Sequence, residues 1–289
     1  MHPEAGTMLD TVAQLGIKYM VFSNGELLDE RFYDSLFAAA VAVRFSVDAA
    51  TPETHSRWHA ANNSRGRGRA DFRRVTHNIG QLVAEKRRRR ARYPDIGCQM
   101  ICSKLTENDF EKFAQLFRDI GVDYIVYKPL QRNEINKSIS VSSLDLHSSE
   151  EERDEQARRM VEELQGIARR YQTESFFVHV KTDQIERAYV KEFNDGERYD
   201  RCLAHPLAPM IEPDGNVYLC IDHGGDPRFV IGNIYHNTID EIWRSTLRQR
   251  VIARIDLSHS CPAGCFLDET NLVLHQVARP DPALHHELI

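Results

Sequence analysis

The first 180 residues alternate between short apolar runs and segments in which apolar residues recur every three or four positions. The short runs predict strands at residues 17–22, 41–47, 96–102, 122–127 and 176–180. The helical spacing predicts helices near residues 8–15, 29–38, 72–83, 110–120 and 148–171. Strands that alternate with helices favour an α/β fold with one parallel sheet and right-handed crossovers.

Polar residues mark the ends of several of these predicted elements. The pair Asn24-Gly25 predicts a turn after the first strand. Thr106 and Asp109 have the spacing of a capping box at the start of the helix at 110–120, and Gly121 is expected to end that helix.

Beyond Asp195 the sequence changes character, because prolines, glycines and four of the six cysteines are concentrated there. We therefore expect a domain boundary at this point, with one domain at residues 1–195 and a smaller one at residues 196–289.

Composition narrows the class of protein. The chain has 289 residues, a net charge of -6 and 42% hydrophobic residues, which is enough apolar content to fold around a core. No run of 18 apolar residues occurs, and the first 25 residues carry Glu4, Asp10 and Lys18. A membrane span and a secretory signal are thus both disfavoured. We expect a cytoplasmic protein without a membrane partner, whose cysteines are thiols, metal ligands or catalytic groups rather than disulfides.

Four cysteines form the strongest chemical signal. Cys202 and Cys220 are separated by twelve residues, Gly215 and four more residues, and Cys261-x3-Cys265 follows 40 residues later. A turn at residues 213–216 is expected to join a hairpin that brings Cys202 near Cys220. Four thiolates are the complement that one [4Fe-4S] cluster requires.

Two other interpretations of these thiols stay open, namely a structural zinc site and unliganded buried thiols. Zinc sites usually place two to four residues within a ligand pair, and Cys202 and Cys220 do not follow that spacing. Cys98 and Cys102 lie on a predicted buried strand and are expected to be core residues. His205, Asp222 and His223 flank two of the four cysteines, where they could move protons, donate hydrogen bonds to a cluster, or be ordinary turn residues.

A basic segment at residues 65–92 supports a different hypothesis, a module that binds nucleic acid. The alternative is a solvated helix end, because cations in the last turn interact favourably with the helix dipole. No aromatic residues interleave the run 86–90 and the whole chain is acidic, so we favour the helix end and expect no nucleic-acid partner.

The cysteine pattern resembles the C-terminal half of a radical S-adenosylmethionine enzyme with a SPASM or twitch extension, in which such a hairpin opens the extension. Residues 229–234 and 239–243 resemble the segment that follows it. Residues 22–25 and 44–48 are similar to two strand ends of the family's barrel. The resemblance implies that Asn24, Ser46 and Asp48 contact the cofactor, with Ser46 and Asp48 near its ribose and methionyl parts.

The resemblance also implies a fold and a set of cofactors. The expected fold is a partial (β/α) TIM-like barrel followed by a small cysteine-rich α+β domain, in which Cys202, Cys220, Cys261 and Cys265 hold an auxiliary [4Fe-4S] cluster. The Cys-x3-Cys-x2-Cys loop of the family is absent from this sequence. S-adenosylmethionine and a second cluster are therefore expected only with an additional N-terminal segment that carries this loop, and the first βα units of the barrel are expected to be missing.

In this family the cofactor yields a 5'-deoxyadenosyl radical that abstracts a hydrogen atom from the substrate. The resemblance thus implies an enzyme that modifies a small molecule or a peptide, with a flavodoxin or ferredoxin as electron donor. The alternative is an iron-sulfur remnant without catalytic activity.

Overall fold

The computed structural model describes residues 4–62, 71–130, 149–191, 193–194 and 196–279. These residues divide into two compact units. The first holds the residues up to Leu130 together with Glu155–Ile185, and the second holds residues 149–154 together with the residues from Glu186 onward. The expected domain boundary at residue 195 stays a prediction.

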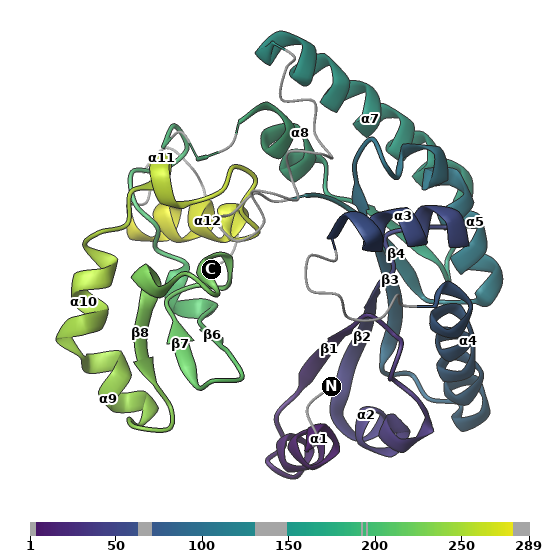
Figure 1. The fold of residues 1–289 in the computed structure, drawn as a ribbon, viewed down its shortest axis with the longest axis horizontal. Helices are drawn as coiled ribbons and strands as arrows, with labels where there is room; N and C mark the ends of the chain where they lie inside the picture. Colours follow the sequence, from purple (N-terminus) through teal and green to yellow (C-terminus); the bar gives the residue numbers. More distant parts are fainter. Residues whose placement is uncertain (1–3, 63–70, 131–148, 192, 195, 280–289) are drawn as a thin grey trace. The chain divides into compact units, whose positions relative to one another are not determined.

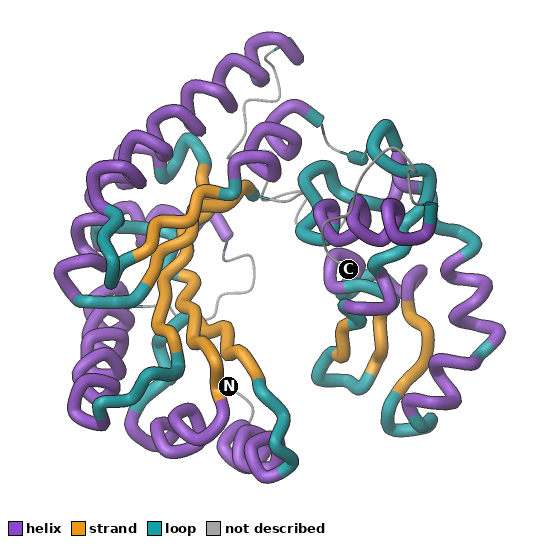
Figure 2. The backbone as a smooth tube through the Cα atoms, turned by 180° about the vertical axis from the view of Figure 1, so that it is seen from behind, coloured by secondary structure: helices purple, strands orange, loops and turns teal. Residues whose placement is uncertain are grey.

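A parallel five-stranded sheet forms the centre of the first unit (Figures 1 and 2). Its strands follow one another in chain order, so each βα connection leads to the neighbouring strand. They are β1 (Tyr19–Ser23), β2 (Ala40–Ser46), β3 (Asp95–Cys102), β4 (Tyr124–Pro129) and β5 (Phe177–Val180). The five strands and the parallel α/β fold expected from the sequence are confirmed.

Helices alternate with these strands, and α4, α5 and α7 cover one face of the sheet (Figure 1). Their buried stripes are apolar at helical spacing, as in Phe110, Phe113 and Phe117 of α5. The helices of this part of the chain are α1 (Ala5–Gln14), α2 (Tyr33–Ala39), α3 (Pro52–Asn62), α4 (Phe72–Arg89), α5 (Phe110–Ile120), α7 (Glu150–Tyr171) and α8 (Thr182–Val190).

The capping box expected at Thr106 and Asp109 is wrong. A short 3₁₀ turn (Glu107–Asp109) precedes α5, and neither side chain caps the helix. The Thr106 hydroxyl instead donates to the carbonyl of Ile101 at 2.8 Å, and the Asp109 carboxylate accepts the backbone N–H of Ala50 at 2.9 Å. Both side chains are buried, and they bind backbone groups of β3 and of the loop after β2, which the local sequence pattern could not show. Gly121 does end α5, in the left-handed conformation.

The part of the second unit that the structure describes contains a small antiparallel sheet followed by a series of helices. The strands are β6 (Met210–Ile211), β7 (Asn216–Tyr218) and β8 (Val230–Asn233), and the expected hairpin between β6 and β7 is confirmed. The helices are α9 (Ile239–Arg244), α10 (Thr246–Ile252), α11 (Leu257–Ser260) and α12 (Asp268–Ala278). One apolar cluster of this unit holds Val217, Leu219, Phe229, Ile231, Ile242 and Val251.

Cys98 and Cys102 are completely buried on β3, as expected of core residues. Burial alone raises the pKa of the Cys98 thiol, and burial is also the main cause for Cys102. Among the helices of the described residues, none is long and apolar enough to cross a membrane.

Candidate iron-sulfur site

The structure brings the four cysteines of the predicted site together around one small cavity of the second unit. Cys220 is the second residue after β7, and Leu219 lies between them. Cys261 is the first residue after α11. Cys202 and Cys265 line the same cavity from the loops before β6 and before α12. Apolar side chains close the wall between them, namely Leu219, Ile255, Pro262 and Leu267.

Hydrogen-bonding groups contact the sulfur atoms of Cys202, Cys220 and Cys265. The side-chain amide of Asn271 donates to Cys202 Sγ at 3.5 Å, and the backbone N–H of Leu267 donates to Cys265 Sγ at 3.4 Å. The Cys265 thiol itself donates to the Asp222 carboxylate at 3.1 Å. N–H donors that point at sulfur are a common feature of thiolates that bind iron.

The raised pKa values of Cys220 and Cys261 indicate that the cavity favours the binding of positively charged ions. Burial, followed by the charge of Asp222, raises the pKa of Cys220 to about 12. Burial, followed by the neighbouring Cys202 and Cys220, likewise raises the pKa of Cys261. Thiolates crowded in an apolar cavity need compensating positive charge, and iron ions supply it.

The arrangement of the donors distinguishes a site for a single zinc ion from a site for a [4Fe-4S] cluster. No three His, Cys, Asp or Glu side chains of the described chain converge in a way that would hold a single metal ion. In a [4Fe-4S] cluster each thiolate binds a different iron, so the four ligands need not converge on one point. A further feature of the cavity is His205 Nδ1, a buried atom that has no hydrogen-bond partner within the described chain. The residues present therefore fit a cluster of this kind.

His205, Asp222 and His223 all line the cavity, as their positions beside the cysteines suggested. Burial lowers the pKa of each of the two histidines to about 4, so both imidazoles are neutral near pH 7. The His223 ring also stacks on Phe229, with 3.7 Å between the ring centroids. A neutral imidazole can donate one N–H to a cluster without adding charge to the site.

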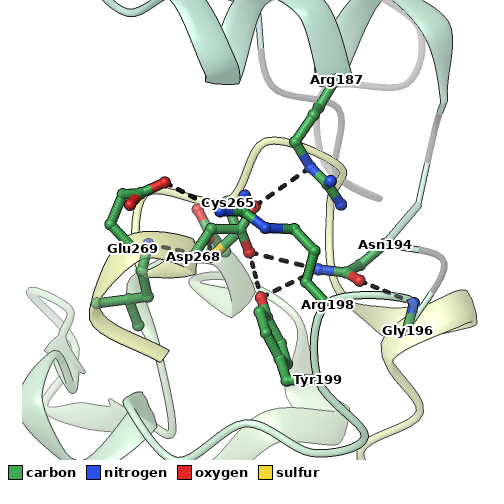
Figure 3. A network of polar contacts seen from close by, with 10 residues as sticks. Arg187, Asn194, Gly196, Arg198, Tyr199, Cys265, Asp268 and Glu269 are labelled. Atoms are coloured by element: carbon green, nitrogen blue, oxygen red, sulfur yellow. Dashed lines mark hydrogen bonds and ion pairs between the residues drawn. The ribbon is translucent and has the colours of Figure 1, made fainter. Parts of the chain in front are cut away.

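A buried polar network holds the loops of the site in place, and it was not predicted from the sequence (Figure 3). The hydroxyl of Tyr199 donates to Asp268, and the Asn194 side chain donates to the Tyr199 oxygen at 3.0 Å. Arg187 and Arg198 lie 3.6 and 4.0 Å from the same carboxylate. The network joins the segment before Cys202 to the start of α12, directly after Cys265.

A sequence signal for this network did exist in α12. Asp268 and Asn271 are three residues apart and so lie on one face of the helix, where both are buried. Polar residues on the buried face of a helix need internal hydrogen-bond partners, and their spacing was the available clue.

Asn24, Ser46 and Asp48 lie at the carboxyl ends of neighbouring parallel strands. Asn24 follows β1 and is exposed, and its side chain accepts the backbone N–H of Glu26 at 3.2 Å. Ser46 ends β2, and Asp48 follows it with a left-handed backbone, at a φ of 56°. Ligands of parallel α/β sheets bind at this edge, so the placement is compatible with the expected cofactor contacts.

Two details set Asp48 and Ser46 apart from ordinary loop residues. Asp48 is fully buried, which raises its pKa to about 6, and its carboxylate accepts the backbone N–H of Ile101 at 2.8 Å. Gln99 of β3 donates to Ser46 Oγ at 2.9 Å, while its own Oε1 is buried without a partner among the described residues. The buried Oε1 of Gln99, next to Ser46 at the end of β2, is thus a hydrogen-bond acceptor that was not predicted from the sequence.

The basic run at the end of α4 is largely paired inside the protein. Lys86 lies 2.8 Å from Asp123, and Arg88 and Arg89 lie 2.6 and 2.7 Å from Glu85. These pairs favour the helix-end interpretation of the run. Residues 65–70 of the basic segment lie outside the described residues.

Comparison with known proteins agrees with this site. Residues 202–266 match the SPASM family, described as an iron-sulfur cluster-binding domain, and all four cysteines fall within that span. No curated protein was found to match the chain.

Three solved structures share the fold. Streptococcus suis SuiB bound to S-adenosylmethionine is 13% identical, with a TM-score of 0.59 over 86% of this chain and 53% of SuiB. SuiB bound to the precursor peptide SuiA is 13% identical, with a TM-score of 0.58 over 87% of this chain and 53% of SuiB. The protein anSMEcpe with bound AdoMet and Cp18Cys peptide is 13% identical, with a TM-score of 0.52 over 94% of this chain and 80% of that one.

The α/β fold of the chain is thus similar to that of the SuiB structure bound to S-adenosylmethionine, and the site lies in a segment that matches an iron-sulfur cluster-binding domain. The chain spans about half the length of the SuiB structures that it matches.

Proposed function

We propose that Cys202, Cys220, Cys261 and Cys265 bind one [4Fe-4S] cluster, in a protein that uses S-adenosylmethionine to modify a peptide or a small molecule. One observation carries the proposal: four thiols that are far apart in the sequence line one cavity, inside the segment that matches a cluster-binding domain. Such a cluster supplies single-electron transfer when it is bound.

The residues of the cavity have separate tasks in this proposal. The four thiolates occupy all four iron positions and leave none open for a substrate, which favours electron transfer or a structural role. Leu219, Ile255 and Leu267 limit the access of water to the sulfur atoms. The neutral His205 keeps a donor in the cavity without raising its charge.

We further propose that Ser46, Asp48 and Asn24 contact S-adenosylmethionine at the carboxyl edge of the parallel sheet. A structure of similar fold, SuiB, is described as bound to S-adenosylmethionine. Cleavage of this cofactor would also require a Cys-x3-Cys-x2-Cys loop for a second cluster, which the printed sequence does not contain. We therefore assign that chemistry to a form of the protein that includes such a loop.

A peptide is the substrate class that we favour, because two proteins of similar fold are described in complex with peptides. Electrons for the clusters would come from a flavodoxin or a ferredoxin. We place the protein in the cytoplasm, where the thiols remain reduced until they bind iron.

Anaerobic reconstitution of the chain with iron and sulfide tests the cluster directly. We expect about four iron atoms per chain and the electron paramagnetic resonance (EPR) spectrum of a reduced [4Fe-4S] cluster. Replacing any one of the four cysteines by serine should lower the iron content and alter that spectrum. Cys98→Ala is the matched control, because Cys98 is a buried thiol outside the site, and its iron content should equal that of the wild type.

Negligible iron in the reconstituted wild type, with all six thiols still titratable, would overturn the proposal. Zinc bound in place of iron, at one ion per chain and with the same dependence on the four cysteines, would support the structural alternative instead.

A further inference from the structure

We propose that Asn271 is a positioning residue for the cluster: it fixes the orientation of Cys202 and raises the reduction potential by donating an N–H to its sulfur. This inference rests on the proposed cluster. Asn271 lies beyond residues 202–266, the span that matches the cluster-binding family, so that match does not assign it a role.

Asn271 uses both ends of its carboxamide on the segment that carries Cys202. Its Oδ1 accepts the backbone N–H groups of Leu203 at 2.7 Å and of Ala204 at 2.9 Å. Its Nδ2 donates to Cys202 Sγ at 3.5 Å. One side chain therefore holds the backbone directly after the ligand and the ligand's sulfur atom.

The burial of Asn271 makes these contacts specific. The residue is 1% exposed, so its donor has no access to bulk water and must be satisfied by the protein. Asn271 is the fourth residue of α12, and asparagine has a low helix propensity, which indicates that the side chain is selected for its contacts. No other residue type of this size supplies two accepting lone pairs and an N–H donor in the same plane.

The donor has a defined effect on an iron-bound thiolate. Reduction adds negative charge to the cluster and its ligands, and an N–H that points at sulfur stabilises this charge. Asp222 has the opposite effect on the reduction potential, because its carboxylate faces Cys265 and disfavours added negative charge. Asn271 thus offsets part of the effect of Asp222.

The variant Asn271→Asp separates the two roles of the side chain. Aspartate retains an oxygen for the N–H groups of Leu203 and Ala204, but it replaces the N–H that faces Cys202 by oxygen. We expect reconstituted Asn271→Asp to contain as much iron as the wild type and to have a more negative midpoint potential, measured by EPR-monitored redox titration at pH 8.

His275→Phe is the matched control on the same helix. His275 bonds the carbonyl of Arg201 at 2.8 Å and stacks on Tyr199, and neither contact reaches a sulfur atom. Phenylalanine can keep the stacking and loses only the hydrogen bond. We expect its midpoint potential to match that of the wild type, so that a shift in Asn271→Asp reports the exchange of the N–H that faces Cys202 for a carboxylate oxygen, and the ¹⁵N measurement below tests the N–H contact itself.

A measurement on the unmodified protein covers the case in which Asn271→Asp does not load iron. Wild-type protein labelled with ¹⁵N-asparagine, reduced and examined by pulsed EPR, should show a coupling between a ¹⁵N nucleus and the cluster.

Wild-type potential in fully loaded Asn271→Asp, or no ¹⁵N coupling in the loaded wild type, would overturn the inference and leave the cluster intact. Failure of the wild type to bind iron would overturn the proposed function itself. The two results are distinguished by the iron content of the wild type.

Discussion

The Tyr199 hydroxyl donates a hydrogen bond to the Asp268 carboxylate, and both side chains are buried. This contact links the segment before Cys202 to the helix after Cys265, in the centre of the network in Figure 3. Burial, followed by the hydrogen bond to Asp268, raises the pKa of Tyr199, so the tyrosine stays neutral and remains a donor.

Removing this hydroxyl should destabilise the second unit. We expect Tyr199→Phe to lower the free energy of unfolding by about 1 to 3 kcal/mol, because Asp268 loses a buried donor. Urea unfolding followed by the fluorescence of Trp243 measures the change, since Trp243 lies in α9 of that unit. Tyr235→Phe is the control: its hydroxyl reaches the carbonyl of Pro213 at 3.3 Å on the surface, and its loss should change stability by less than about 0.5 kcal/mol. Equal effects of the two variants would contradict the prediction.

Asp48 should make the first unit less stable as the pH rises. Its pKa is about 6 in the folded chain, against an ordinary value of 3.8, so the fold favours the protonated form. The contribution of Asp48 to the free energy of unfolding is therefore largest below about pH 4, and it is lost as the pH rises from about 4 through 6. We expect a loss of about 2 to 3 kcal/mol across this window relative to Asp48→Asn, which cannot ionise.

The fluorescence of Trp58 gives a local measurement of the same titration, because its side chain is hydrogen-bonded to Asp48. The chain has two tryptophans, so Trp243→Phe leaves Trp58 as the single emitter. We expect its emission to titrate near pH 6 and to become independent of pH in this range once Asp48→Asn is added. A pH-independent signal in the single-tryptophan protein would show that Asp48 does not titrate there.

Gly97 is required by the close approach of Tyr124. A Cβ at position 97 would clash with the ring of Tyr124, the residue that pairs with Gly97 on the neighbouring strand β4. Gly97→Ala should displace the ring from its contact with His179 and destabilise the first unit by about 1 to 3 kcal/mol. Gly80→Ala is the matched control within α4, where a Cβ meets no atom within 4 Å. We expect it to stabilise the helix by about 0.5 to 1 kcal/mol in the same denaturation experiment. Two variants of equal stability would contradict the role assigned to Tyr124.

The chain should not retain nucleic acid at physiological salt. Lys86, Arg88 and Arg89 already form ion pairs with carboxylates of the chain, which reduces the positive charge available to phosphates. A filter-binding assay with a labelled oligonucleotide at about 150 mM salt checks this expectation. Retention that disappears when Arg87, Arg88, Arg89 and Arg90 are replaced by alanine would contradict it.

Some features of the fold could be predicted because they depend on local periodicity. The apolar runs of the first 180 residues produced five strands in the expected places, and the turn at 213–216 produced the expected hairpin. Thr106 and Asp109 show where this reasoning fails: capping residues are recognised by spacing, yet the partners of these two side chains are Ile101 and Ala50. A buried polar side chain bonds whatever backbone group the fold places beside it.

The sequence by itself determined the parallel α/β class, the core position of Cys98 and Cys102, and the choice of four cysteines as a set. These follow from the alternation of apolar residues and from the number of ligands that a cluster needs. Only the tertiary structure decided that all four thiols line one cavity, that Asn271 contacts Cys202, and that Asp268 binds Tyr199. The contacts of Asn271 with Cys202 and of Asp268 with Tyr199 each join residues that are 69 positions apart in the sequence. They form when packing brings distant loops together, and no periodic pattern in the chain records which loops will meet.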